Sequence, residues 1–129
     1  MKKTMLIRGL FLAAAVFETV LGLAFLSAPD EIFERFSVEP PNHWGYVQFP
    51  AAVLLIFAWM FLVVALRPEA RRHLIPYGIL LKLSFAGIVL RYWFDAGVPG
   101  LWKPLAIIDL ATAALFAWAY VTLIRGKDT

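Results

Sequence analysis

The chain has 129 residues, of which 62% are hydrophobic and only 16% are charged, and its mean hydropathy is +0.77. A soluble domain is typically about half apolar, so this composition predicts a membrane protein with one domain, residues 1–129. The absence of cysteine excludes disulfides, thiol catalysis and thiolate metal sites. The net charge of +3 does not indicate a nucleic-acid partner, because the basic residues flank apolar stretches, where they orient membrane proteins.

Four long apolar stretches lie at about residues 5–26, 47–66, 74–94 and 102–124. Each is about 20 residues long, which as a helix of about 30 Å matches the hydrocarbon core of a bilayer. The stretches are continuous and rich in Ala and Leu rather than alternating, which favours helices over strands. Because the last three are joined by short connections, neighbouring helices should run in opposite directions. The predicted fold is all-α, an antiparallel bundle of four transmembrane helices.

The first stretch follows Met1-Lys2-Lys3 and therefore resembles a secretory signal. However, Glu18 interrupts its apolar core, and its small residues end at Ala28, directly before Pro29. We therefore expect this segment to be the first transmembrane helix rather than a cleaved leader.

The longest connection, about residues 27–46, contains a second helix signal. Residues 29–31 are Pro-Asp-Glu, a typical helix start with proline and acids in the first turn. Ile32, Phe33 and Phe36 then share one face, which predicts a short amphipathic helix on the outer membrane surface. Aromatic residues at the ends of the spans are expected to anchor at the interface. They are Trp44, Tyr46, Tyr92, Trp93 and Trp102.

The basic residues are divided unequally between the two sides of the predicted bundle. One side carries Lys2, Lys3, Arg8, Arg67, Arg71, Arg72, Arg125 and Lys127. The other side carries Arg35, Arg91 and Lys103. Since basic loops stay in the cytoplasm, we expect a multi-pass protein of a bacterial inner membrane with both termini cytoplasmic.

Three ionisable side chains, Glu18, Lys82 and Asp109, interrupt the apolar spans. A charge at the bilayer centre costs about 3 kcal/mol on insertion scales, so such groups face the bundle interior or pair with one another. Small residues lie three or four positions away on the same helix faces, where they allow close helix contact. They are Ala14 and Gly22, Gly78 and Ala86, and Ala106 and Ala113.

The three charges should meet at one depth. With a rise of about 1.5 Å per residue, all three lie within roughly 10 Å of one level, and Lys82 is long enough to reach either acid. Arg91, two turns further out, and Gln48, near the start of the second span, are candidates to join them. We therefore predict a polar cluster in the outer half of the bundle as the candidate binding site.

Three interpretations of this cluster remain open. The charges can simply neutralise one another and fix helix register. They can line a polar pocket or proton relay that opens outward, or one charge can face a partner subunit. The leading functional hypothesis is a non-enzymatic accessory or interaction subunit that contacts another membrane subunit or a second copy of the chain. The alternative is a small transporter or proton-coupled ligand-binding protein; a membrane enzyme or redox carrier is third.

No catalytic residue, metal site or cofactor is predicted. His43 and His73 fall on opposite sides of the predicted membrane, so they cannot share a metal or haem. The Glu-x-x-His motif of di-metal bundles is absent, as are phosphate-binding glycine loops and nucleophile elbows.

The architecture resembles that of small four-helix bacterial membrane proteins of the DoxX-like group. The likeness rests on Arg8-Gly9-Leu10-Phe11, on Gly22 near the end of the first helix, on residues 77–82 and on Trp102-Lys103-Pro104. It covers the whole chain in layout. The resemblance implies a four-helix fold and a membrane location, and it assigns no role to any residue.

Overall fold

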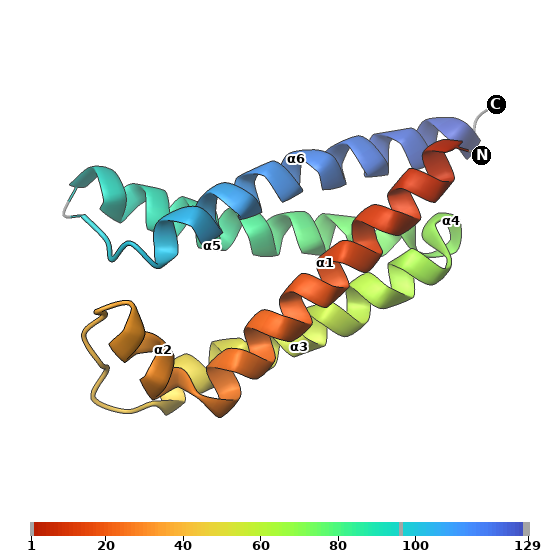
Figure 1. Ribbon diagram of the computed structural model, residues 1–129. Helices are drawn as coiled ribbons and strands as arrows, with labels where there is room; N and C mark the ends of the chain where they lie inside the picture. Colours follow the sequence, from red (N-terminus) through yellow and green to blue (C-terminus); the bar gives the residue numbers. More distant parts are fainter. Residues whose placement is uncertain (1, 96, 128–129) are drawn as a thin grey trace.

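The computed structural model describes residues 2–95 and 97–127. Within these residues every regular element is helical, as predicted. The elements are α1 (Lys2–Ser27), α2 (Pro29–Arg35), α3 (Gly45–Leu66), α4 (Pro68–Arg71), the 3-10 helix η1 (Arg72–Leu74), α5 (Ile75–Asp95) and α6 (Trp102–Lys127). Figure 1 shows their arrangement.

Four of the helical segments are long and apolar enough to cross a membrane. They are α1, α3, the segment Pro68–Asp95 that includes α5, and α6. This result confirms the four predicted apolar helices. The helix bounds differ from the predicted stretches by at most three residues at either end.

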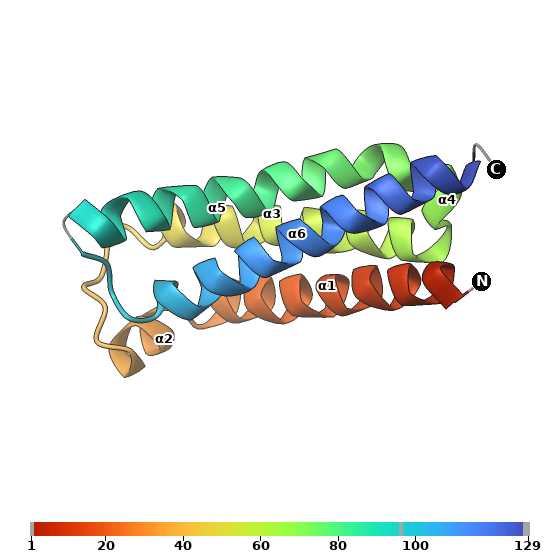
Figure 2. The same cartoon turned by 90° about the horizontal axis from the view of Figure 1, so that it is seen from above.

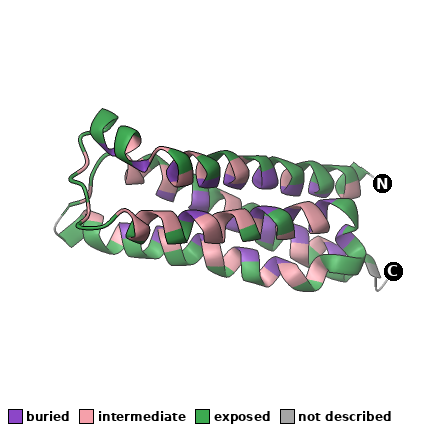
Figure 3. Cartoon of the chain, turned by 90° about the horizontal axis from the view of Figure 1, so that it is seen from below, coloured by how far each residue is buried: buried purple, intermediate pink, exposed green. Residues whose placement is uncertain are grey.

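The long helices associate as two pairs, α1 with α3 and α5 with α6. Figure 1 shows the pairs close together at the end that carries both termini and diverging toward the end that carries α2, and Figure 2 shows the same helices from above. We call these the terminus end and the α2 end. Buried residues face the other helices, while apolar side chains such as Ile56 and Trp59 remain exposed on the outside (Figure 3). An apolar outer surface favours a lipid environment.

At the terminus end, three phenylalanine rings join the two pairs. Phe116 of α6 stacks on Phe11 of α1 with centroids 4.4 Å apart and meets Phe61 of α3 edge-on at 5.1 Å. All three side chains are fully buried. A Cβ atom at Gly78 would lie 2.7 Å from Cε1 of Phe61, so only glycine fits beside this ring. We call Phe11, Phe61 and Phe116 the phenylalanine core.

Two contacts fix α1 against α3. The Arg8 side chain donates a hydrogen bond from Nε to the Ala65 carbonyl, 3.1 Å away, near the end of α3. Further along α1, a Cβ atom at Gly22 would lie 2.9 Å from the backbone oxygen of Ala51. The absence of a side chain at Gly22 therefore lets the two helices approach closely.

The short helix α2 forms where its start signal predicts, and its apolar residues differ in burial. Phe33 is 5% exposed and packs against Trp44 and Trp102, with centroids 5.1 and 6.0 Å away. Phe36 is 52% exposed and caps the helix, which ends at Arg35. Trp44 and Trp102 are partly buried in the same cluster of side chains. The placement of α2 and of these rings at the membrane surface stays a prediction.

Candidate functional site

The three ionisable residues of the apolar helices are buried on the faces where the helices meet. Glu18 and Lys82 are each 1% exposed and Asp109 is 8% exposed. The small residues around them are buried on the same faces, which confirms the prediction from their spacing. They include Ala14, Gly22, Gly78, Ala86, Ala106 and Ala113.

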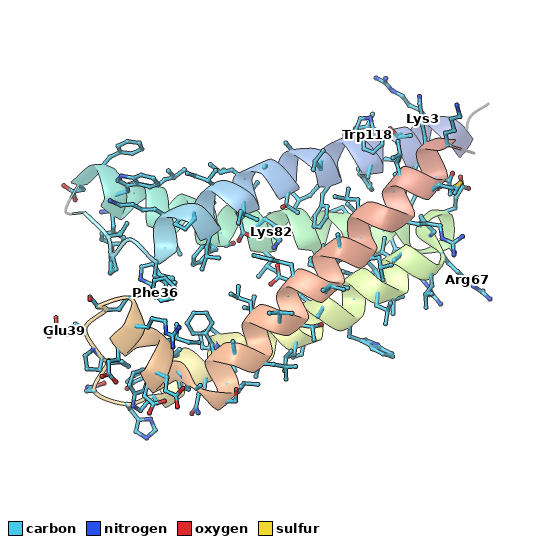
Figure 4. All side chains as sticks on the ribbon, viewed as in Figure 1. Lys3, Phe36, Glu39, Arg67, Lys82 and Trp118 are labelled. Atoms are coloured by element: carbon cyan, nitrogen blue, oxygen red, sulfur yellow. The ribbon has the colours of Figure 1, made fainter. Side chains whose placement is uncertain are left out.

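Lys82 bridges the two acids. Its ammonium donates hydrogen bonds to Oε1 of Glu18 and to Oδ1 of Asp109, and the second bond is 3.0 Å long. Glu18 comes from α1, Lys82 from α5 and Asp109 from α6, so the pair α5–α6 is tied to the pair α1–α3 through α1. Figure 4 shows Lys82 between the two pairs, near the middle of the molecule. We call these three residues the charge cluster.

Aromatic rings shield the ammonium of Lys82 on the remaining sides. Its Nζ lies 5.1 Å from the centroid of Phe17 and 6.0 Å from that of Phe61. A cation above a ring face is attracted to the ring, and the attraction grows when water is excluded. The ammonium is therefore held between two carboxylates and two rings, an arrangement that fixes its position.

One carboxylate oxygen of the charge cluster is buried without a partner. Oε2 of Glu18 is buried and has no hydrogen-bond partner among the described residues. Leaving a buried acceptor unsatisfied costs about 1–3 kcal/mol, and more for a charged group. Such an atom in an otherwise well-packed protein requires an explanation, and a ligand that donates to it is one.

A cavity of about 580 Å³ lies on the α2 side of the charge cluster, between the two helix pairs. Glu18 and Asp109 both line it, and the other lining side chains are predominantly aromatic and aliphatic. Those walls include Phe17, Leu21, Phe25, Phe33, Leu54, Phe85, Ile88, Trp102 and Leu105. The cavity forms because the pairs diverge toward α2, while the phenylalanine core fills the space between them on the other side.

Arg91 and Gln48, the other two predicted members, lie outside the charge cluster. The Arg91 side chain is exposed, and its guanidinium lies 5.5 Å from the ring centroid of Tyr92. Gln48 instead donates a hydrogen bond from Nε2 to the carbonyl of Leu26, 3.2 Å away, at the end of α1. That carbonyl belongs to the last turn of a helix, where it has no partner within the helix, so it attracts the amide away from the cluster.

The cavity walls were not predicted as parts of a site. Phe25 stacks on Trp102 at 6.0 Å, and Phe85 meets the same indole edge-on at 6.3 Å, so Trp102 is the central ring of the wall. Tryptophan at the start of a membrane helix is typical of an interface anchor, which hides this role in the sequence. The sequence does offer one signal, because aromatic residues gather in those halves of three spans that lie toward α2.

The described residues contain no group of three or more His, Cys, Asp or Glu side chains arranged to hold a metal ion. His43 accepts a hydrogen bond at Nδ1 from the backbone of Gly45, 2.9 Å away, and so helps to start α3. Its role is thereby explained by local structure.

The chain matches no protein-family model, no curated protein sequence and no solved structure. The resemblance to DoxX-like proteins therefore stays a prediction. Function has to be argued from the charge cluster and the cavity beside it.

Proposed function

We propose that this chain is an integral membrane protein whose long helices span the bilayer as an antiparallel bundle with both termini in the cytoplasm. The number and apolar length of the helices support the span, and the two termini lie at one end of the molecule (Figure 1). Basic side chains gather at that end, including Lys3, Arg8, Arg67 and Arg125, which supports its cytoplasmic placement by the positive-inside rule. A reporter fused to the C-terminus of the full chain should be active in the cytoplasm; periplasmic activity would overturn this orientation.

We further propose that the protein binds a largely apolar small molecule whose single polar group reaches the charge cluster. The observation that carries this proposal is that Glu18 and Asp109 line one end of a cavity whose other walls are predominantly apolar. The volume of about 580 Å³ lies within the range of about 300–1,000 Å³ typical of ligand pockets, and a few polar groups in an apolar pocket fix a ligand's orientation.

The unpartnered oxygen Oε2 of Glu18 indicates which kind of polar group the ligand carries. While Glu18 is ionised its carboxylate only accepts hydrogen bonds, so a ligand that binds this form supplies a donor at this point. The apolar remainder would lie against Phe25, Leu54 and Trp102 toward the α2 end. A ligand of this shape is available from the bilayer itself or from the outer aqueous side.

A binding role is better supported than a continuous transport path. The phenylalanine core and neighbouring buried residues such as Val64 and Ala119 fill the space between the pairs at the terminus end. The cavity therefore has its polar end at the middle of the molecule and its apolar part toward α2. The accessory-subunit hypothesis stays a prediction, because no described surface identifies a partner.

Photolabelling tests the binding site directly. The probe is trifluoromethyl-diazirinyl benzyl alcohol, a neutral apolar molecule with one hydroxyl donor, applied to the full chain in lipid nanodiscs. We expect saturable labelling of the wild type and its loss in Leu54→Trp, because the indole would fill the cavity. Ile56→Trp is the matched control, since Ile56 lies on the same helix but is 66% exposed on the outer surface. Labelling that does not saturate, or that is equal in the two variants, would overturn the proposal.

A further inference from the structure

The formal charges of the charge cluster do not sum to zero. It contains two carboxylates and one ammonium, so it carries one net negative charge when all three groups are ionised. An unpaired charge inside an apolar bundle is costly, whereas a paired one is tolerated. The cluster therefore requires one further positive charge or one proton, and Oε2 of Glu18 is a buried carboxylate oxygen with no partner to supply it.

The described part of the chain supplies no second cation at this point. Lys82 is already shared between the two acids. Arg91 lies over Tyr92, and the Lys103 ammonium lies 5.2 Å from the ring centroid of Trp93. Neither Arg91 nor Lys103 lines the cavity, where the titratable side chains are Glu18 of α1, Asp109 of α6 and Tyr46 of α3, with Lys82 of α5 bound to both acids. Neutralisation has to come from outside.

We propose that the cavity selects a monocationic apolar amine, whose ammonium binds Glu18 and replaces the proton that otherwise neutralises the charge cluster. This inference rests on the proposed binding function and names its ligand class. The ammonium donates a hydrogen bond to Oε2 of Glu18, the buried carboxylate oxygen that has no partner among the described residues. Aromatic side chains also line the cavity, among them Phe17 and Phe25, and aromatic rings attract cations as well as apolar groups.

The exchange conserves charge without any covalent step. In the ligand-free protein one carboxyl group of the cluster holds a proton, and the cluster is neutral. When the ammonium enters, that carboxyl releases its proton to the solvent, and the amine keeps all of its own protons. Binding of one amine should therefore release about one proton per protein molecule.

Isothermal titration calorimetry compares a cation with its neutral analogue of the same shape. The probes are phenylbutylamine, which is cationic at neutral pH, and phenylbutanol, titrated into the full chain in nanodiscs. We expect the amine to bind at least about tenfold more tightly than the alcohol, since removing one partner of a buried charge pair typically costs more than a factor of ten. Titration in buffers with different ionisation enthalpies should give about one proton released with the amine and none with the alcohol.

Two variants complete the test. Glu18→Gln should lower the affinity for the amine about tenfold and the affinity for the alcohol much less, because the side-chain carbonyl of Gln can still accept a hydrogen bond from the hydroxyl. Retained binding of the alcohol also reports that the cavity has formed. Glu34→Gln, an exposed acid on α2, is the matched control and should change neither. If Glu18→Gln does not bind the alcohol at all, the same titrations are made with Asp109→Asn in its place, and the same loss of preference for the amine is expected.

The outcomes separate the two proposals. If neither probe binds the wild type, the binding function and the ligand class both fail. If the alcohol binds as tightly as the amine and no proton is released, the cavity binds apolar molecules but the preference for a cation is wrong.

Discussion

Lys82 of α5 donates a hydrogen bond to Glu18 of α1, a residue 64 positions away in the chain. This bond crosses from one helix pair to the other, while the bond from Lys82 to Asp109 stays within the pair α5–α6. The interaction with Glu18 therefore holds the two pairs together at the depth where the cavity begins. Its position gives the charge cluster a structural role in addition to the proposed binding role.

Removing the ammonium of Lys82 should destabilise the protein more than removing the ring of Phe17 or of Phe61, which lie beside it. Lys82→Met leaves two buried carboxylates without a counter-charge, and breaking a buried ion pair typically costs about 3–5 kcal/mol. We expect the free energy of unfolding to fall by about 3 kcal/mol, measured by circular dichroism during titration of mixed micelles with sodium dodecyl sulfate.

The control for this change is Lys103→Met, because Lys103 contacts a ring rather than a carboxylate. The triple variant Glu18→Gln, Lys82→Met, Asp109→Asn should regain most of the lost stability, since it buries no charge. Equal losses for Lys82→Met and Lys103→Met, or no recovery in the triple variant, would contradict the account of the cluster as a coupled unit.

Gly22 should be intolerant of a methyl group. A Cβ atom there would lie 2.9 Å from the Ala51 backbone oxygen and 2.9 Å from Cδ2 of Leu55, so α1 and α3 would have to separate. Overpacking of this kind costs about 1–3 kcal/mol, and Gly22→Ala should lower the free energy of unfolding by that amount. Gly9→Ala lies on the same helix with no atom within 4 Å and should be neutral or slightly stabilising. The same detergent titration separates them, and similar stability of the two variants would refute the close contact.

The phenylalanine core should carry much of the packing at the terminus end. Phe→Ala in a protein core costs about 3–5 kcal/mol, part of which is transfer from water and does not apply in a bilayer, so we expect about 2 kcal/mol for Phe116→Ala. Leu115→Ala is the control on the neighbouring, exposed position. If both substitutions changed the unfolding midpoint equally, the ring contacts with Phe11 and Phe61 would not be responsible for joining the helix pairs.

Phe33 of α2 should limit access to the cavity. It lines the cavity and packs against Trp102, whereas Phe36 is exposed beyond the end of α2. Because the chain has no cysteine, Leu21→Cys introduces a single thiol in the cavity wall. Adding Phe33→Ala should speed its reaction with N-ethylmaleimide several-fold, and adding Phe36→Ala should not. The reaction rate is measured by mass spectrometry, and equal rates would show that α2 does not cover the cavity.

The sequence predicted the features that depend on one helix at a time. The apolar runs locate the four long helices, and the small residues around Glu18, Lys82 and Asp109 place those charges on contact faces, because both signals follow from helical periodicity. The reach of a lysine side chain was sufficient to predict that Lys82 meets the acids.

The features that depend on how helices diverge were not predictable in this way. The pairing of α1 with α3 depends on facing volumes such as Gly22 against Ala51 and Leu55, which no single helix reveals. The close approach of the two pairs at the terminus end likewise depends on Phe61 beside Gly78. Likewise, Gln48 and Arg91 have the spacing to join the cluster, yet the Leu26 carbonyl and the Tyr92 ring offer closer contacts. The end of α2 at Arg35, one residue before Phe36, was not predictable either, because sequence signals locate a helix end only to within a residue or two.

The measurement that most directly tests the central claim is a nuclear Overhauser experiment on the methyl-labelled full chain in deuterated micelles with phenylbutylamine. The account predicts contacts between the protons of the amine and the methyl groups of Leu21, Leu54 and Ile88, which line the cavity. It also predicts that Glu18→Gln weakens these contacts while Glu34→Gln leaves them intact. Contacts confined to outward-facing methyl groups such as those of Ile56 and Leu115 would contradict a binding site at the charge cluster.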